Sequence, residues 1–117
     1  MRFVVLTHDW PAHHWDFLVE AQGALRAWRL LAEPFADVDI PVEPNFDHRL
    51  FYLDYEGPVS GGRGTVSRWD AGTCDWLLDA EDRVELALQG AKLKGHALFR
   101  REAGAWVFRF TGPGAAG

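Results

Sequence analysis

The residues best suited to chemistry lie in one short stretch, from His8 to Asp16, which holds three of the five histidines and two carboxylates. The run that begins at His14 reads as a strand, and alternate side chains of a strand share a face, so His14 and Asp16 point the same way. His8 precedes a turn marked by Pro11 and can fold back towards that face. Two imidazoles and one carboxylate that converge in this way form a three-point site for a divalent metal ion, with coordination positions left for water or substrate.

The composition is that of one small globular domain with a single core. The chain has 117 residues, of which 48% are hydrophobic and 14% aromatic. A net charge of −5 argues against nucleic-acid binding by bulk positive charge, so any such role must depend on strand ends or on a local basic patch. The lone Cys74 excludes an intrachain disulfide and a cysteine-based zinc finger. No apolar run reaches the length of a signal-peptide core or a membrane span, and we expect a cytoplasmic protein with no membrane contact.

Short runs of alternating apolar residues, separated by turn signals, predict strands through most of the chain. The predicted strands cover residues 2–6, 14–20, 24–31, 48–54, 65–69, 73–77, 83–89, 93–100 and 105–110. The run 24–31 also suits a helix, because alanine, leucine and arginine favour helices, but its place after the Gln22-Gly23 turn favours a strand. A turn signal at residues 70–72 separates two of the strands.

Two long loops interrupt these strands. Residues 32–47 hold three prolines and several acids, which break any regular pattern. Residues 57–64 hold four glycines but lack the Lys-Ser/Thr ending of a nucleotide-binding P-loop. The whole pattern predicts an all-β fold, a small antiparallel β-barrel of about eight strands with long loops, as one domain over residues 1–111 with a flexible tail over residues 112–117.

Several pieces of the chain, taken in order, resemble the 3'-phosphoesterase domain of bacterial DNA ligase D. The pieces include His8-Asp9, His14-Trp15-Asp16-Phe17, Gly23-Ala24-Leu25, Asp47-His48, Asp54-Tyr55-Glu56-Gly57, Trp69-Asp70-Ala71-Gly72-Thr73 and Lys92-Leu93-Lys94-Gly95. The resemblance extends from about residue 2 to residue 101, which is nearly the whole chain. It implies a small β-barrel whose relatives trim 3' ends during DNA break repair, removing a 3'-phosphate or a terminal 3'-ribonucleoside, usually with manganese.

The resemblance also implies roles for individual residues. It identifies His8, His14 and Asp16 as the expected metal ligands, His48 as the histidine that contacts the scissile phosphate, and Asp9 as an acid that supports the ligands from behind. His14, Asp16 and His48 are accordingly the expected catalytic residues. Mn²⁺ is the expected metal, and a mixed site of nitrogen and oxygen ligands is also compatible with Zn²⁺ or Co²⁺.

The chain departs from the family where the family binds phosphate. Leu18 stands at the place of an arginine, Ala32 at that of a lysine, and Ile40 near that of a basic residue, while Phe46 replaces an acid. Phosphoryl transfer depends on positive charge held against the non-bridging oxygens, so each lost cation predicts a rate loss on the order of 10²–10³-fold.

Three arginines are candidate replacements for these cations. Arg63 in the glycine-rich loop is the strongest candidate, and Arg49 directly follows His48, although on a strand it would point to the opposite face. Arg68 lies on the next predicted strand. We expect Arg63 and Arg49 to join His48 in binding phosphate.

The sequence leaves three functions open. The first is a short stand-alone, manganese-dependent 3'-phosphoesterase that processes DNA or DNA/RNA 3' ends, with a separately encoded DNA ligase or polymerase as a candidate partner. The second is a catalytically weakened relative that binds DNA ends or a repair partner without turnover, which the missing cations favour. The third is a phosphoesterase that acts on a small phosphate ester.

Overall fold

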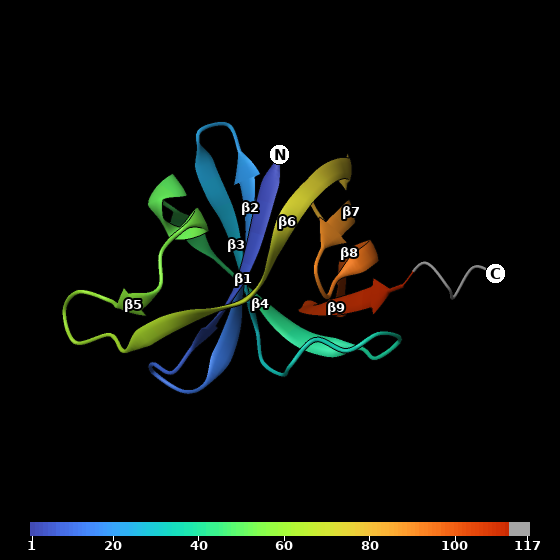
Figure 1. The fold of residues 1–117 in the computed structure, drawn as a ribbon. Helices are drawn as coiled ribbons and strands as arrows, with labels where there is room; N and C mark the ends of the chain where they lie inside the picture. The colour runs from blue at the N-terminus through green and yellow to red at the C-terminus, as the bar shows by residue number, and fades with distance from the viewer. Residues whose placement is uncertain (113–117) are drawn as a thin grey trace.

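The structure, a computed structural model, describes residues 1–112, and all its regular elements are strands except for one short 3-10 turn (Figure 1). The elements are β1 (Arg2–His8), β2 (His14–Ala21), β3 (Ala24–Leu30), β4 (Ile40–His48), η1 (Leu50–Leu53), β5 (Gly57–Pro58), β6 (Thr65–Asp79), β7 (Arg83–Gly90), β8 (Lys94–Glu102) and β9 (Ala105–Thr111). The predicted all-β fold is confirmed, and the segment 24–30 is a strand rather than a helix. No helix within the described part of the chain has the length and apolar character needed to cross a membrane.

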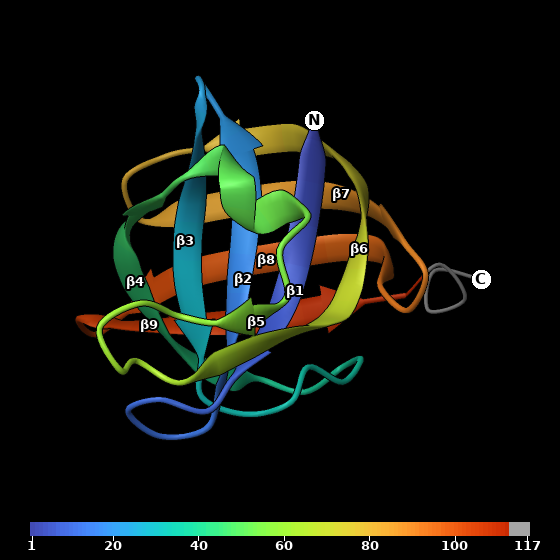
Figure 2. The same ribbon diagram turned by 60° about the vertical axis from the view of Figure 1, so that its left-hand side comes forward.

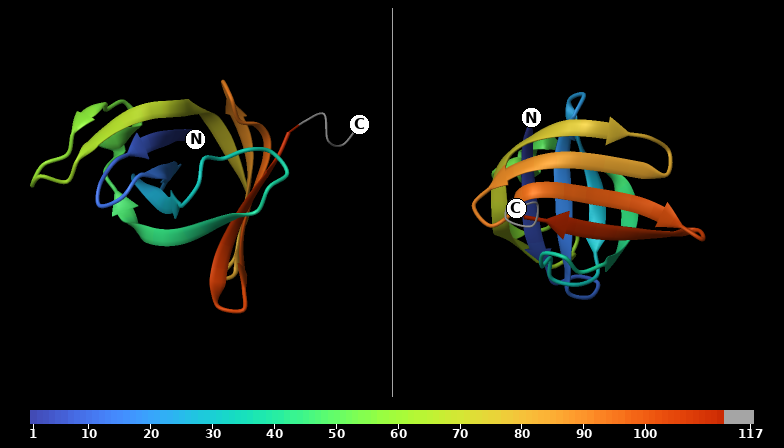
Figure 3. Two further views of the ribbon diagram at one scale, coloured as in Figure 1. Left: turned by 90° about the horizontal axis from the view of Figure 1, so that it is seen from below. Right: turned by 90° about the vertical axis from the view of Figure 1, so that its right-hand side faces the viewer.

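The strands form one antiparallel sheet that closes into a barrel. Its order is β1-β2-β3-β4-β9-β8-β7-β6-β5, and β1 also pairs with the long strand β6, which leaves the two-residue β5 as an addition to a barrel of eight strands. Strands β1–β3 cross β7–β9 steeply in Figure 2, and β6–β9 lie side by side across the front of the right-hand view in Figure 3. Closure leaves the barrel strands few open edges.

The barrel interior is filled largely by aromatic rings. Phe17 lies at its centre, with its ring 5.4 Å from that of Phe99 and 5.7 Å from that of Phe108. Trp28 stacks on Phe99 at 4.2 Å between centroids. These rings come from the two crossing groups of strands, so their packing joins the N-terminal and C-terminal halves of the barrel.

The strands β1–β3 are buried on both faces, and this property positions the site. Phe3 and Val5 of β1 face the barrel interior, whereas Val4 and Leu6 belong to a second apolar cluster with Leu18. Leu53 of η1 completes this second cluster, because the chain after β4 folds back over the outer face of the sheet (Figure 2). Burial of both faces explains why the sequence has continuous rather than alternating apolar runs here.

Two predictions for residues 32–54 are wrong. Residues 40–48 form β4 rather than a loop, although the strand contains Pro41 and Pro44. Strand β4 pairs with β9 only from Ile40 to Val42, and Pro44 lies beyond that point, where β4 is an edge and a missing N–H is tolerated. Residues 48–54 do not form a strand, since Leu50–Leu53 adopt a 3-10 turn.

The predicted turn at residues 70–72 is also wrong, because β6 is a single strand of 15 residues. The side chain of Asp70 accepts hydrogen bonds from the backbone N–H groups of Ala91, Lys92 and Leu93, and so fixes the β7–β8 turn. Gly72 is needed for a close approach, since a Cβ there would lie 2.1 Å from the carbonyl oxygen of Gln89. Both turn-like residues therefore serve contacts that are distant in the sequence. The tail predicted over residues 112–117 lies outside the described residues from position 113 onward.

Candidate active site

The β1–β2 hairpin brings the three expected metal ligands together. His8 pairs with His14 in the ladder, and Asp16 follows two residues later on the same face. One oxygen of Asp16 lies 2.9 Å from His8 Nδ1, and the other lies 2.8 Å from His14 Nε2. The ligand atoms of the three residues all lie within 4.8 Å of one another, although His14 and Asp16 are only 2% and 5% exposed.

The backbone fixes which nitrogen of each imidazole faces the carboxylate. His8 Nε2 lies 2.8 Å from the carbonyl oxygen of Arg63, and His14 Nδ1 lies 2.9 Å from that of Ala12. A carbonyl oxygen only accepts, so these two nitrogens carry the hydrogens. When both rings are neutral, the other two nitrogens point their lone pairs at the Asp16 oxygens, which also only accept hydrogen bonds. Such an arrangement is stable only if each ring gains a proton or a metal ion binds between the three groups. A metal-binding histidine commonly donates its second N–H to a backbone carbonyl in this way, so the donor set fits Mn²⁺, Zn²⁺ or Co²⁺.

The pKa of His8 and the pKa of Asp16 depend on each other, because the two side chains are in contact. The hydrogen bond to Asp16 raises the pKa of His8 above its ordinary 6.5 and outweighs the effect of burial. Burial raises the pKa of Asp16, but the hydrogen bonds from His14 and His8 outweigh it and lower that pKa to about 2. Asp16 is therefore an ionised carboxylate in a mostly buried position, which suits a cation site.

Asp9 supports the cluster from outside the ligand set. Its carboxylate accepts a hydrogen bond of 2.7 Å from the backbone N–H of Thr65, directly after the glycine-rich loop. That contact joins the β1–β2 turn to the segment that carries the Arg63 carbonyl bound by His8. The supporting role predicted for Asp9 stays a prediction, and the structure gives its carboxylate a structural hydrogen bond beside the cluster.

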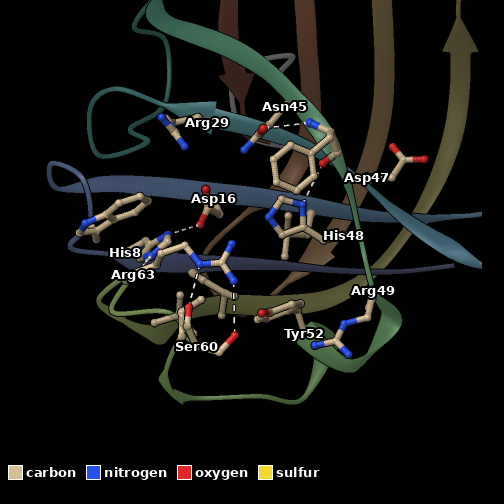
Figure 4. Close-up of a pocket in the computed structure, with 16 residues that line it drawn as sticks. His8, Asp16, Arg29, Asn45, Asp47, His48, Arg49, Tyr52, Ser60 and Arg63 are labelled. Atoms are coloured by element: carbon tan, nitrogen blue, oxygen red, sulfur yellow. Dashed lines mark hydrogen bonds and ion pairs between the residues drawn. The ribbon is translucent and has the colours of Figure 1, made fainter.

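A pocket of about 390 Å³ opens beside the cluster. His8 and Asp16 lie on one wall, and β3, β4, η1 and the loop after β5 supply other lining residues (Figure 4). Its polar and charged lining consists of His8, Asp16, Arg29, Asn45, Asp47, His48, Arg49, Tyr52, Ser60 and Arg63. The structure thus brings two of the expected metal ligands and the expected phosphate-contacting residues to one cavity.

His48 is held in a defined orientation at the end of β4. Its Nδ1 donates to the carbonyl oxygen of Phe46 at 2.9 Å, so Nε2 is left for a ligand. The imidazole stacks on the ring of Phe46 at 5.2 Å with an interplanar angle of 13°, and its centroid lies 5.8 Å from that of Tyr52 in a T-shaped arrangement. Contacts with two aromatic rings restrict the imidazole, which suits a group that must be held in place to bind a ligand.

Both predicted arginines line the pocket, although one prediction about them is wrong. Arg63 is held by its own loop, since Nε donates to the carbonyl of Ser60 at 2.8 Å. Arg49 does not point away from the site, because residues 48–54 are not a strand, and its guanidinium lies 5.5 Å from the ring centroid of Phe51. Arg68 is not part of the pocket lining and donates instead to the carbonyl of Leu53.

The four residues that stand where the resemblance predicts charged groups contribute no positive charge. Leu18 is fully buried and gives the pocket an apolar floor, and Ile40 lies in the barrel core. Ala32 is exposed in the loop before β4, and Phe46 is 73% exposed at the pocket.

Sequence reasoning missed Arg29, which lines the pocket from β3. The β2–β3 hairpin pairs Arg29 directly with Asp16, so both side chains leave the same face of the sheet. The two positions are equally far from the Gln22-Gly23 turn, so the expected hairpin register already contained this pairing. Asn45, Tyr52 and Ser60 also line the pocket and had no sequence signal of their own.

Comparison with known proteins identifies relatives of the whole domain. The family described as the DNA Ligase D 3'-phosphoesterase domain matches residues 6–101. The multifunctional non-homologous end joining protein LigD of Pseudomonas aeruginosa is 34% identical over 108 residues, which is 81% of this chain and 12% of that protein. The corresponding DNA repair protein of Mycobacterium tuberculosis H37Rv is 29% identical over 116 residues, or 90% of this chain and 15% of that protein. The chain therefore spans only a small part of the length of these relatives.

Metal binding should stabilise the protein more strongly as the pH rises. Without metal, the raised pKa of His8 stabilises the fold below 6.5, and this contribution is lost as the pH rises through the higher folded-state value. A metal replaces that proton, so the gain in Tm on adding Mn²⁺ should grow over the same range. Thermal unfolding at a series of pH values, with and without Mn²⁺, measures this gain in Tm. His14→Gln should abolish the gain and His13→Gln should keep it, and a gain that persists in His14→Gln would contradict the ligand assignment.

Gly64 should be required for the loop that anchors His8. A Cβ there would lie 2.2 Å from Asp9 Oδ1 and 2.6 Å from Trp10 Cβ, whereas a Cβ at Gly62 meets nothing within 4 Å. Both glycines have positive φ, at +78° and +68°, so alanine costs on the order of 1 kcal/mol of backbone strain at either place. Gly64→Ala should therefore lower the urea midpoint further than Gly62→Ala and also weaken Mn²⁺ binding. Equal effects of the two substitutions on both measurements would contradict this account.

Proposed function

The chain belongs to the family of DNA ligase D 3'-phosphoesterase domains, and on that premise we propose that it is a metal-dependent phosphoesterase that processes 3' ends in DNA break repair. The proposed substrates are DNA or DNA/RNA ends that carry a 3'-phosphate or a terminal 3'-ribonucleotide. The observation that carries the proposal is the convergence of His8, His14 and Asp16 beside a pocket that also contains His48. A separately encoded DNA ligase or polymerase is the proposed partner.

His8, His14 and Asp16 would hold the metal, for which we propose Mn²⁺, with Zn²⁺ or Co²⁺ as alternatives. A bound ion of this kind polarises a phosphoryl oxygen and lowers the pKa of a coordinated water. The two backbone carbonyls that accept from His8 and His14 keep both rings in the tautomer that ligation needs.

His48 and Arg63 would act on the phosphate itself. With Nδ1 committed to a carbonyl, His48 Nε2 is the atom that can donate a hydrogen bond to a phosphate oxygen, or a proton to the leaving oxygen, when the ring is protonated. The Arg63 guanidinium supplies a permanent positive charge for the non-bridging oxygens, and its loop orients it through Ser60.

A second candidate function has a specific observation in its favour. The positions of Leu18 and Phe46 add an apolar floor and an exposed ring to the pocket where relatives place charged groups. A site with fewer cations stabilises the phosphoryl transition state less, so the chain can be a weakened relative that binds DNA ends or a repair partner without turnover.

Release of phosphate from a 3'-phosphorylated duplex tests the proposal. We expect release that depends on Mn²⁺, with a loss on the order of 10²-fold or more in kcat for His48→Ala, because a positioned proton donor is removed. His96→Gln is the matched control, since His96 binds Glu85 outside the pocket. Binding of 3'-phosphate ends without release by the wild type would favour the second function, and neither binding nor release would contradict both.

A further inference from the structure

Among the described residues, Arg29 is the pocket arginine that has a buried side-chain nitrogen without a hydrogen-bond partner. Its Nε is buried and has no hydrogen-bond partner among the residues that the structure describes. Arg63 is bound by Ser60, and Arg49 rests on Phe51. The carboxylate nearest in register, Asp16, contacts His8 and His14 through its two oxygens and makes no ion pair with Arg29 within the described chain.

The position of Arg29 allows its guanidinium to bind an anion in the pocket. It lines the same pocket as His48 and Arg63, and in Figure 4 Arg29 and Arg63 lie on opposite sides of Asp16. A buried guanidinium N–H without a partner is costly, and the Arg29 side chain lines an open pocket, so an anion in that pocket can supply acceptors to the guanidinium. The planar fork of an arginine matches the oxygens of a phosphate.

We propose that Arg29 is a phosphate-binding residue of this chain and takes over charge that relatives place elsewhere. The nearest lost cation is at Leu18, one step further along the same face of β2, and Arg29 projects from the neighbouring strand β3 onto that face. Its ligand is the terminal phosphate of a 3' end, a dianion whose non-bridging oxygens can accept from the guanidinium. This inference rests on the proposed function for the identity of the ligand.

Fluorescence anisotropy with labelled 3'-phosphate and 3'-hydroxyl oligonucleotides tests the inference in EDTA, where metal-dependent turnover is absent. The wild type should prefer the 3'-phosphate, and Arg29→Met should weaken binding of that end about tenfold to hundredfold, while binding of the 3'-hydroxyl end changes little. Arg29→Lys should restore part of the preference. Arg101→Met, which removes an exposed arginine outside the pocket, should behave as the wild type.

Two outcomes would overturn the assignment of Arg29. One is a wild-type preference retained in Arg29→Met, and the other is a wild type that does not distinguish the two ends. An unchanged gain in Tm on adding Mn²⁺ establishes that Arg29→Met is folded and keeps its metal site. The assay of phosphate release by the wild type tests the proposed function, whereas binding in EDTA tests Arg29. A wild type that binds through Arg29 but releases no phosphate would contradict the proposed function alone.

A second inference concerns a row of aromatic rings that begins at the pocket with Phe46. Phe46 is 73% exposed and stacks on His48, which meets Tyr52, and Tyr52 in turn meets Phe51 at 5.3 Å. Phe51 is itself 53% exposed. Phe46 lines the pocket, whereas Phe51 reaches it only through Tyr52, and neither exposed ring contributes much to the core, so this surface indicates a binding role.

We further infer that Phe46 stacks on the terminal nucleobase of an unpaired 3' end. The ring is continuous with His48, so a nucleotide whose 3'-phosphate reaches His48 brings its own base next to the rim. Arg49 and Arg63 line the same pocket and match the charge of the backbone. Stacking on an aromatic ring is available to every base and does not depend on a strongly basic surface, which suits a chain of net charge −5.

An abasic terminus separates stacking from phosphate contact. In EDTA, Phe46→Ala should weaken binding of a single-stranded 3'-phosphate oligonucleotide roughly fivefold to hundredfold, but should not change binding of the same oligonucleotide with an abasic terminal residue. Phe46→Trp should keep the wild-type difference. Phe35→Ala is the matched control, because Phe35 is 60% exposed and does not line the pocket. Equal losses on both oligonucleotides, or no loss on either, would overturn the stacking role.

Discussion

The site depends on one arrangement, in which two backbone carbonyls force two imidazoles to aim their lone pairs at the same carboxylate. The carbonyl of Arg63 fixes His8 and that of Ala12 fixes His14, so both free nitrogens face Asp16. These acceptors come from two turns, one after β1 and one before β6, and neither turn is inside the barrel wall. The orientation of both imidazoles is thus set by loop geometry, which explains why a glycine such as Gly64 matters to the proposed metal site.

The outer face of β1–β3 supplies the support for this arrangement. A small barrel has one interior, and here the rings around Phe17 fill it, so a functional cavity cannot lie inside. The chain instead returns through η1 and the loop that follows it to cover the outer face, where Leu6 and Leu18 form an apolar base beneath Asp16. The low polarity of that base strengthens the interaction of Asp16 with any cation and with the two imidazoles.

Features encoded by nearby residues could be predicted from the sequence, and those encoded by distant contacts could not. The β1–β2 hairpin and the shared face of His14 and Asp16 followed from the period-two alternation of side chains along a strand. Counting back equally from the Gln22-Gly23 turn would also have paired Arg29 with Asp16. By contrast, Asp70 was mistaken for a turn residue. Its role depends on three backbone N–H groups some twenty residues later, which no local pattern reveals. The 3-10 turn that brings Arg49 to the pocket depends on burial of Leu53 against β1 and left no periodic signal.

The two halves of the site have different structural supports, and this difference bears on how the half proposed to bind phosphate can change. Asp16 lies between partners in β1 and β3, and His14 pairs with His8 at the end of the β1–β2 ladder, so few substitutions can preserve their geometry. A cation for phosphate needs only to reach the pocket, and an arginine has a long side chain that can do so from several backbones. Loss of charge at Leu18 on β2 is therefore compatible with charge at Arg29 on β3 and at Arg63 in a loop, because all three positions border one cavity. A phosphate between Arg29 and Arg63 would be bound from two sides of Asp16, so the mutual repulsion of the phosphate and that carboxylate would be offset on both sides by a guanidinium.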